Sequence, residues 1–228
     1  MGQNRLAELI DDIEDYFLCQ SELYGSEFYI DRDIREIWRS PREIKGRLLD
    51  ELKQRILDCK RCGLAAKRRT VVFGDGNPDA KIMLIGEAPG MEEDIQGKVF
   101  VGPAGQLLTN ILAAIHLDRD DIYITNILKC RPPQNRDPQE DEQTICSVHL
   151  FKQIEIIQPR FILALGRIAG QFLSGEKGSV MNDLRNKIYS VKGSQMMVTY
   201  HPAALLRNPE LKRPTWDDIQ KFQKLYEQ

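Results

Sequence analysis

Short apolar segments alternate with amphipathic ones along most of the chain. From Lys81 onward, four short runs rich in apolar and β-branched residues each follow a polar segment or turn, at residues 82–85, 122–125, 161–165 and 196–199. Helical spacing of apolar residues marks the segments 105–115, 139–157, 167–173 and 216–226. Fully apolar strands that alternate with helices are typical of a parallel sheet covered on both faces, so the pattern predicts an α/β fold.

The first part of the chain has a different character. Residues 5–18 have the pattern of an amphipathic helix. Ser40 and Pro41 resemble the N-cap and first position of a second helix, which would run through Ile56 to a C-x-x-C pair. We therefore expect an acidic, helical extension over residues 1–45 and one globular domain over residues 46–228.

Composition excludes several classes of protein. Of 228 residues, 42% are hydrophobic and 29% charged, which is typical of a folded domain and excludes disorder as the main state. The chain has no apolar run long enough to cross a membrane and no apolar signal core at its start, so we expect a cytoplasmic protein. The net charge of −2 combines −5 in residues 1–45 with +3 in the remainder, which permits a polyanionic ligand without demanding one.

Ligands of such sheets bind beyond the carboxyl ends of the strands. The loop after the first strand, GEAPGMEED, is neither a Walker loop nor a G-x-G-x-x-G turn, and its four acidic residues oppose phosphate binding. We therefore expect no nucleotide cofactor. Phe100, Asn126 and His201 also fall near this edge, where they could stack on a base, read its polar edge and donate a hydrogen bond. Each of them taken singly is more often structural.

The chain has five cysteines, an odd number in a compartment where disulfides are not expected. Cys59 and Cys62 form the C-x-x-C, Cys130 and Cys146 follow downstream, and Cys19 stands alone. Four thiols remaining after one is set aside suggest a metal centre, and four thiolates suit either an iron–sulfur cluster or zinc. His116 and His149 are interpreted as structural, with His149 as a metal ligand the lesser alternative.

Three motifs carry a resemblance to a known family. GEAPGMEEDIQGKVFVGPAGQLL, YITNILKCRPPQNRDP and TYHPAALLRNP, with the C-x-x-C upstream, resemble the family 4 uracil-DNA glycosylases, the iron–sulfur branch of that superfamily. The resemblance covers residues 59–226. It implies a Rossmann-like three-layer sandwich around a central, mostly parallel four-stranded sheet. It also implies a [4Fe–4S] cluster on Cys59, Cys62, Cys130 and Cys146; the alternative, zinc, fits the wide ligand spacing poorly.

The same resemblance implies an enzyme of base excision repair that flips uracil out of DNA and hydrolyses its N-glycosidic bond. By position, Phe100 would stack on the base, Asn126 would read its edge, His201 would donate towards O2, and Glu93 would exclude the thymine methyl group. Glu87 and His201 would be the catalytic residues. Further contacts are expected from Gly86, Glu87 and Ala88 to uracil, and from a loop of Leu205, Leu206 and Arg207 to the opened duplex.

Some features depart from related branches or leave alternatives open. Other branches place an Asp where Ala88 stands, so the attacking water must be held by Glu87 or by another group. The stretch between Lys129 and Asp137 lacks the inserted loop of a branch that traps DNA covalently. An inert DNA-binding subunit remains an alternative, whereas a zinc deaminase lacks its required H-x-E and P-C-x-x-C motifs. We expect a monomer that binds uracil-containing DNA.

Overall fold

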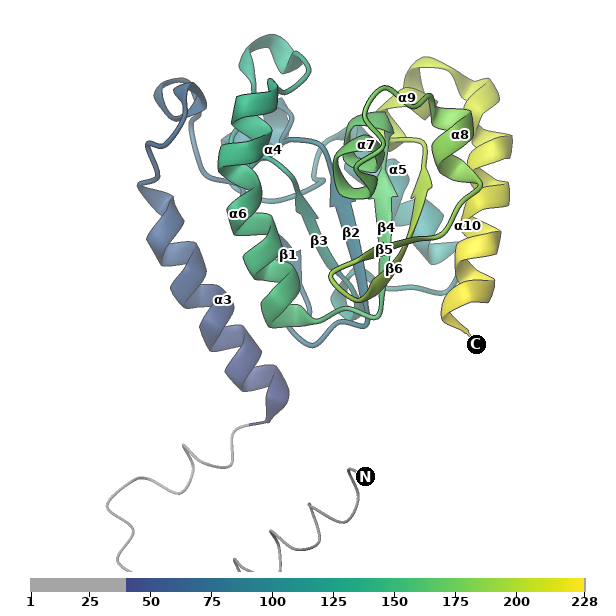
Figure 1. The fold of residues 1–228 in the computed structure, drawn as a ribbon, viewed down its shortest axis with the longest axis horizontal. Helices are drawn as coiled ribbons and strands as arrows, with labels where there is room; N and C mark the ends of the chain where they lie inside the picture. The colour runs from purple at the N-terminus through teal and green to yellow at the C-terminus, as the bar shows by residue number, and fades with distance from the viewer. Residues whose placement is uncertain (1–39, 228) are drawn as a thin grey trace, which may run out of the picture. The chain divides into compact units, whose positions relative to one another are not determined.

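The computed structural model describes residues 40–227 (Figure 1). Residues 41–227 belong to one compact unit. The helix predicted at residues 5–18 and the lone Cys19 lie outside the described residues. Helix α3 (Pro41–Leu57) begins with Pro41 at its first position, as predicted, and ends just before Cys59. The boundary expected after residue 45 falls within α3, and the division into extension and domain stays a prediction.

The other helices and the strands follow the predicted order closely. The strands are β1 (Asp75–Gly76), β2 (Ile82–Gly86), β3 (Tyr123–Asn126), β4 (Phe161–Leu165), β5 (Tyr189–Val191) and β6 (Ser194–Thr199). The helices are α4 (Met91–Gln96), α5 (Pro103–Ala113), α6 (Glu140–Ile157), α7 (Arg167–Ser174), α8 (Met181–Arg185), α9 (Pro202–Arg207) and α10 (Lys212–Tyr226), with short 3₁₀ turns η1 (Gly63–Ala66), η2 (Arg119–Asp121), η3 (Pro133–Asn135) and η4 (Pro209–Leu211). The short helices α4, α8 and α9 were not predicted, because five or six residues are too few to show a helical period.

The sheet has six strands in the order β1-β3-β2-β4-β6-β5, so the prediction of four strands is wrong in number. The four predicted strands pair in parallel in the middle of the sheet. The two additional strands pair antiparallel at the edges, β1 with β3 and β5 with β6. A search for apolar runs does not find these two strands. Strand β1 consists of two exposed residues, Asp75 and Gly76, and only the last of the three residues of β5 is buried.

Helices cover both faces of the sheet, because successive strand residues point to opposite sides. On β2, Met83 and Ile85 pack with residues of α3, α6, α7 and α8. Ile82 and Leu84 pack on the other face with residues of α5 and α10. Three layers result, with α3 packed against α6 on one side of the sheet (Figure 1). The fold is therefore α/β, as predicted, and no helix among residues 40–227 is long and apolar enough to cross a membrane.

The strand order places the carboxyl ends of the parallel strands at a common edge. The chain passes from β2 to its neighbour β3 on one side, and then crosses to β4 on the other side of β2. Such a reversal opens a crevice beyond the strand ends, where α/β sheets bind their ligands. Gly86 ends β2, Asn126 ends β3, and His201 follows β6 by two residues. The residues singled out in the sequence thus arrive at one edge.

Candidate active site

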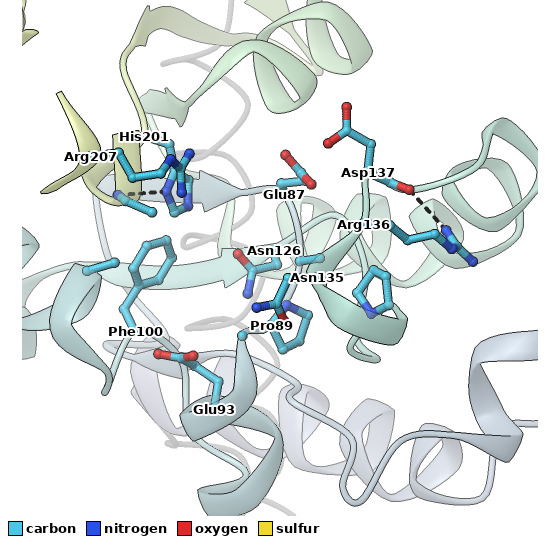
Figure 2. A pocket seen from close by; sticks show the side chains of 15 residues that line it. Glu87, Pro89, Glu93, Phe100, Asn126, Asn135, Arg136, Asp137, His201 and Arg207 are labelled. Atoms are coloured by element: carbon cyan, nitrogen blue, oxygen red, sulfur yellow. Dashed lines mark hydrogen bonds between the residues drawn. The ribbon is translucent and has the colours of Figure 1, made fainter. Parts of the chain in front are cut away.

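A cavity of about 280 Å³ opens at this edge of the sheet. Figure 2 shows the labelled side chains converging on it from the segments that follow β2, β3 and β6. Of the residues predicted to bind substrate or DNA, those that line the cavity are Glu87, Ala88, Glu93, Phe100, Asn126, His201 and Arg207. Further lining residues that the sequence did not single out include Asn135, Arg136 and Asp137. Three distant parts of the chain therefore build one site.

Asn126 is the most unusual polar residue of this cavity. Its side chain is 1% exposed, and its Oδ1 is the only buried side-chain nitrogen or oxygen among residues 40–227 without a hydrogen-bond partner. Gly86, its neighbour in β2, leaves the room for it, since a Cβ at Gly86 would lie 2.3 Å from that Oδ1. An unpaired buried acceptor lowers the stability of the folded protein by about 1–3 kcal/mol, so its presence in a cavity indicates that a bound ligand supplies the missing donor.

Phe100 is held in a strained conformation beside Asn126. Its φ of 49° lies in the left-handed region, which a bulky side chain rarely adopts. The Arg119 guanidinium holds this turn by donating to the carbonyl oxygens of Val99 (2.9 Å) and Phe100 (3.1 Å). A Cβ at Gly105 would lie 1.8 Å from the Phe100 oxygen, so the following helix also depends on a glycine. The ring is therefore placed by its surroundings, of which Gly105 belongs to the sequence motif and Arg119 does not.

His201 faces Phe100, with 5.5 Å between the ring centroids and 29° between the planes. Its Nδ1 accepts a hydrogen bond of 3.1 Å from the Ala203 amide at the start of α9. Burial lowers the pKa of His201 to about 4, and the Arg207 charge acts in the same direction. The imidazole is therefore neutral at pH 7, and because Nδ1 is an acceptor, the proton is on Nε2.

The pKa of Glu87 is shifted in the opposite direction to that of His201. Burial raises the pKa of Glu87 to about 7, and the negative charge of Asp137 acts in the same direction. The cations of Arg167 and Arg207 oppose the shift. Arg167 is itself paired with Asp137 at 3.0 Å. A carboxyl group that titrates near neutrality inside a cavity is suited to accept a proton or a hydrogen bond from water.

Glu93 belongs to helix α4, and its carboxylate is held in place. Its Oε1 accepts hydrogen bonds from the Val101 amide (2.8 Å) and the Gly102 amide (2.9 Å). Gly102 is the N-cap of α5, so the carboxylate satisfies backbone donors that a helix start leaves open. Glu93 therefore lines the cavity as a rigid wall.

The segment expected to be a loop against DNA is a helix. Leu205, Leu206 and Arg207 form the end of α9. Leu205 is 2% exposed and packs inside the protein, so in this structure it offers almost no surface for the expected contact with the opened duplex. Leu206 is 49% exposed, and Arg207 lines the cavity. An amphipathic turn of helix thus separates residues that the sequence presents as equivalent.

The four predicted cluster ligands lie around a second, small cavity. Cys59, Cys62, Cys130 and Cys146 all line it, from the end of α3, the loop after β3 and helix α6. The Lys129 amide donates to the Cys146 sulfur at 3.3 Å, and Arg68 donates to the Cys130 sulfur at 3.4 Å. Such N–H donors stabilise sulfur ligands of clusters.

The arrangement of these thiols bears on what they could hold. Within residues 40–227, no three His, Cys, Asp or Glu side chains are placed to hold a single metal ion. The four thiols instead surround a space, and His149 approaches the Cys59 sulfur only to 4.0 Å. A donor set made of thiols alone, sheltered and supplied with N–H donors, fits an iron–sulfur cluster.

Comparison with known proteins gives the family to which this chain is similar. The model of the uracil DNA glycosylase superfamily matches residues 73–222. The Type-4 uracil-DNA glycosylase of Sulfurisphaera tokodaii is 45% identical over 185 residues, which are 78% of this chain and 84% of that protein. The enzyme of the same name from Archaeoglobus fulgidus is 42% identical to this chain over 184 residues, which are 78% of this chain and 92% of that protein. That of Thermotoga maritima is 44% identical to this chain over 177 residues, which are 76% of this chain and 92% of that protein.

Proposed function

The chain belongs to the uracil DNA glycosylase superfamily, and from this premise we propose that it excises uracil from DNA by hydrolysing the N-glycosidic bond. The product is an abasic site, the starting point of base excision repair. The observation that carries the proposal is the buried, unpartnered Oδ1 of Asn126 in the cavity at the carboxyl edge of the sheet. An amide combines one acceptor with donors, which is what the N3–H and O4 of uracil require.

A base stacked in a duplex cannot reach this cavity, so the target nucleotide must rotate out, at a cost of a few kcal/mol. The cavity lies where a Rossmann-like three-layer sandwich, the fold class we propose for this chain, binds its ligands. At the end of α9, the exposed Leu206 can occupy the gap in the base stack. Arg207, with its cation at the cavity, can bind a phosphate beside the flipped nucleotide.

Inside the cavity, Asn126 and Phe100 recognise the base. The Asn126 Oδ1 accepts from N3–H of uracil and its Nδ2 donates to O4, whereas cytosine presents the opposite pattern. Phe100 presents its ring to the plane of the base, because its backbone turn is held by Arg119. The fixed carboxylate of Glu93 excludes the C5 methyl group of thymine by occupying the space beside that carbon. Gly86 and Ala88 contribute their backbones to the floor.

His201 acts on the leaving base. Cleavage of the N-glycosidic bond builds positive charge on the sugar and negative charge on the departing uracil, as in other glycoside cleavages. A neutral His201, with its proton on Nε2, can donate to the uracil O2 while that charge develops. The Ala203 amide fixes this tautomer through Nδ1. Because the donor is oriented before the reaction, it stabilises the transition state more than the ground state.

Glu87 positions the attacking water. Its carboxylate lies in the cavity, and Ala88 supplies no functional group at the neighbouring position. In its ionised form Glu87 accepts a hydrogen bond from the water and directs the oxygen lone pair to the sugar carbon. Its pKa of about 7 means that the ionised form predominates only above neutrality. The Asp137 carboxylate, on the rim of the cavity, is part of the reason for that pKa.

A [4Fe–4S] cluster would be held by Cys59, Cys62, Cys130 and Cys146. When bound it supplies four strong bonds that fasten the end of α3 and the loop after β3 to α6. That loop begins directly after Asn126, so the cluster would stabilise one wall of the uracil cavity. Every reacting step described above is carried out by side chains outside this centre.

The test is excision from an oligonucleotide with one uracil. The purified full chain is mixed in excess with the labelled strand, and alkali then cleaves any abasic site. We expect cleavage at the uracil and none in matched strands that carry thymine or cytosine there. The His201→Ala variant serves as the control for a contaminating glycosylase. Binding without cleavage would instead indicate an inert DNA-binding subunit.

A further inference from the structure

A buried lysine lies between the two sites just described. The side chain of Lys129 is 2% exposed, in the loop between Asn126 and Cys130. Its Nζ donates three hydrogen bonds, to Thr125 Oγ1 (2.6 Å), to the main-chain oxygen of Asn126 (2.7 Å) and to Gln153 Oε1 (2.6 Å). All three acceptors are uncharged. Buried ammonium groups are rare, and they persist where the surroundings offset the loss of hydration.

The hydrogen bond to the Asn126 oxygen connects Lys129 with base recognition. It holds the main chain where β3 ends, at the residue whose side chain faces the cavity. Thr125 and Gln153 extend this network to the Phe73 oxygen, at 2.9 Å from each side chain. The Asn126 amide itself has no hydrogen-bond partner at Oδ1, so its orientation depends on how firmly its backbone is held.

The same lysine also contacts the four-cysteine site. Its main-chain N–H donates to the Cys146 sulfur at 3.3 Å. Cys146 and Gln153 lie on α6, seven residues or about two helical turns apart, so one face of that helix presents both to Lys129. Because Gln153 accepts from the Lys129 Nζ, the side chain of Lys129 also joins the loop that carries Cys130 to the helix that carries Cys146.

We propose that Lys129 is a positioning residue that ties the base-reading Asn126 to the four-cysteine site. The buried Nζ holds the Asn126 backbone and, through Gln153, holds the loop of Cys130 against α6, which carries Cys146. Removing it therefore weakens both uracil recognition and retention of the cluster. This proposal rests on the proposed function, since it assigns Asn126 to the uracil edge.

The experiment compares Lys129→Met, Asn126→Ala and the double variant with the full-length protein. Single-turnover excision of uracil is measured together with DNA affinity. We expect Lys129→Met to lower the excision rate about 10-fold to 100-fold with DNA affinity changed less than 3-fold. In the Asn126→Ala background, we expect the same change to cost less than about 3-fold, because coupled residues are not additive. Losses that multiply in the double variant would overturn the role in positioning.

A second measurement does not depend on activity. Visible absorbance is followed while a chelator removes iron, and Lys129→Met should lose it several-fold faster than the unaltered protein. Lys152→Met is the matched control, because it removes an exposed lysine of α6 that pairs with Glu155. Equal rates of cluster loss in all three proteins would refute the link between the Lys129 side chain and the four-cysteine site.

Two further outcomes are separable. If Lys129→Met does not fold, Lys129→Gln enters the same cycle, because its amide keeps a polar group in the buried network. If the unaltered protein excises no uracil, the proposed function fails, while the absorbance measurement still tests the link to the cluster. If it is active and the cycle is multiplicative, only the role of Lys129 in positioning Asn126 is refuted.

Discussion

Replacing Asn126 by Asp tests base reading with the smallest change of shape. The variant exchanges the amide donor for an oxygen at a side chain that is 1% exposed. An ionised carboxylate offers acceptors only, so the uracil O4 meets a second acceptor and stays unpaired, as does one oxygen of the carboxylate. At about 1–3 kcal/mol for each unpaired buried group, the loss is roughly 2–6 kcal/mol. That corresponds to a fall of about 30-fold to 10⁴-fold in excision.

The pH dependence of this variant makes the test specific. Protonation gives a carboxyl group one donor and one acceptor, as in the amide, so uracil excision should partly return as the pH falls from 8 to 5. The assay is single-turnover excision from matched strands carrying uracil or cytosine, with Asn110→Ala on the exposed face of α5 as control. If Asn126→Asp keeps full uracil activity at pH 8 and still ignores cytosine, the cavity reads the base elsewhere.

Three other expectations follow from the site. His201→Ala should lower the single-turnover rate about 100-fold and leave DNA affinity nearly unchanged; a loss of affinity alone would make it a binding residue. Excision by the unaltered protein should rise with pH through about 7, as Glu87 ionises, and Glu87→Gln should be slow and lack that rise. The purified protein should be brown, and Cys59→Ala or Cys130→Ala should lose the colour whereas Cys19→Ala keeps it; a colourless protein with one zinc ion would exclude the cluster.

Local hydrophobic pattern was sufficient to predict the middle of the fold. The segments 82–85, 122–125, 161–165 and 196–199 are β2, β3, β4 and β6 to within two residues. A buried parallel strand is apolar along its whole length, so a run of consecutive apolar residues is enough to predict it. The convergence of Glu87, Asn126 and His201 also followed from sequence, because residues after parallel strands share one edge.

Tertiary structure decided what depends on distant partners. The burial of Leu205 beside the exposed Leu206 arises because their segment is a helix, which turns neighbouring side chains to different sides. The tautomer of His201 is set by one backbone amide, and the turn of Phe100 by Arg119, 19 residues away. Hydrogen bonds of this kind join groups that only the folded chain brings together.

The burial of Lys129 could not be predicted from the sequence. A lysine in the loop after β3 is expected to be exposed to solvent. In the folded chain Thr125, the Asn126 carbonyl and Gln153 enclose it, and the last of these comes from a helix more than 20 residues further along. A charged group can be buried only where several acceptors are already fixed in space, and that condition is met by packing the sheet against α6, not by any local pattern.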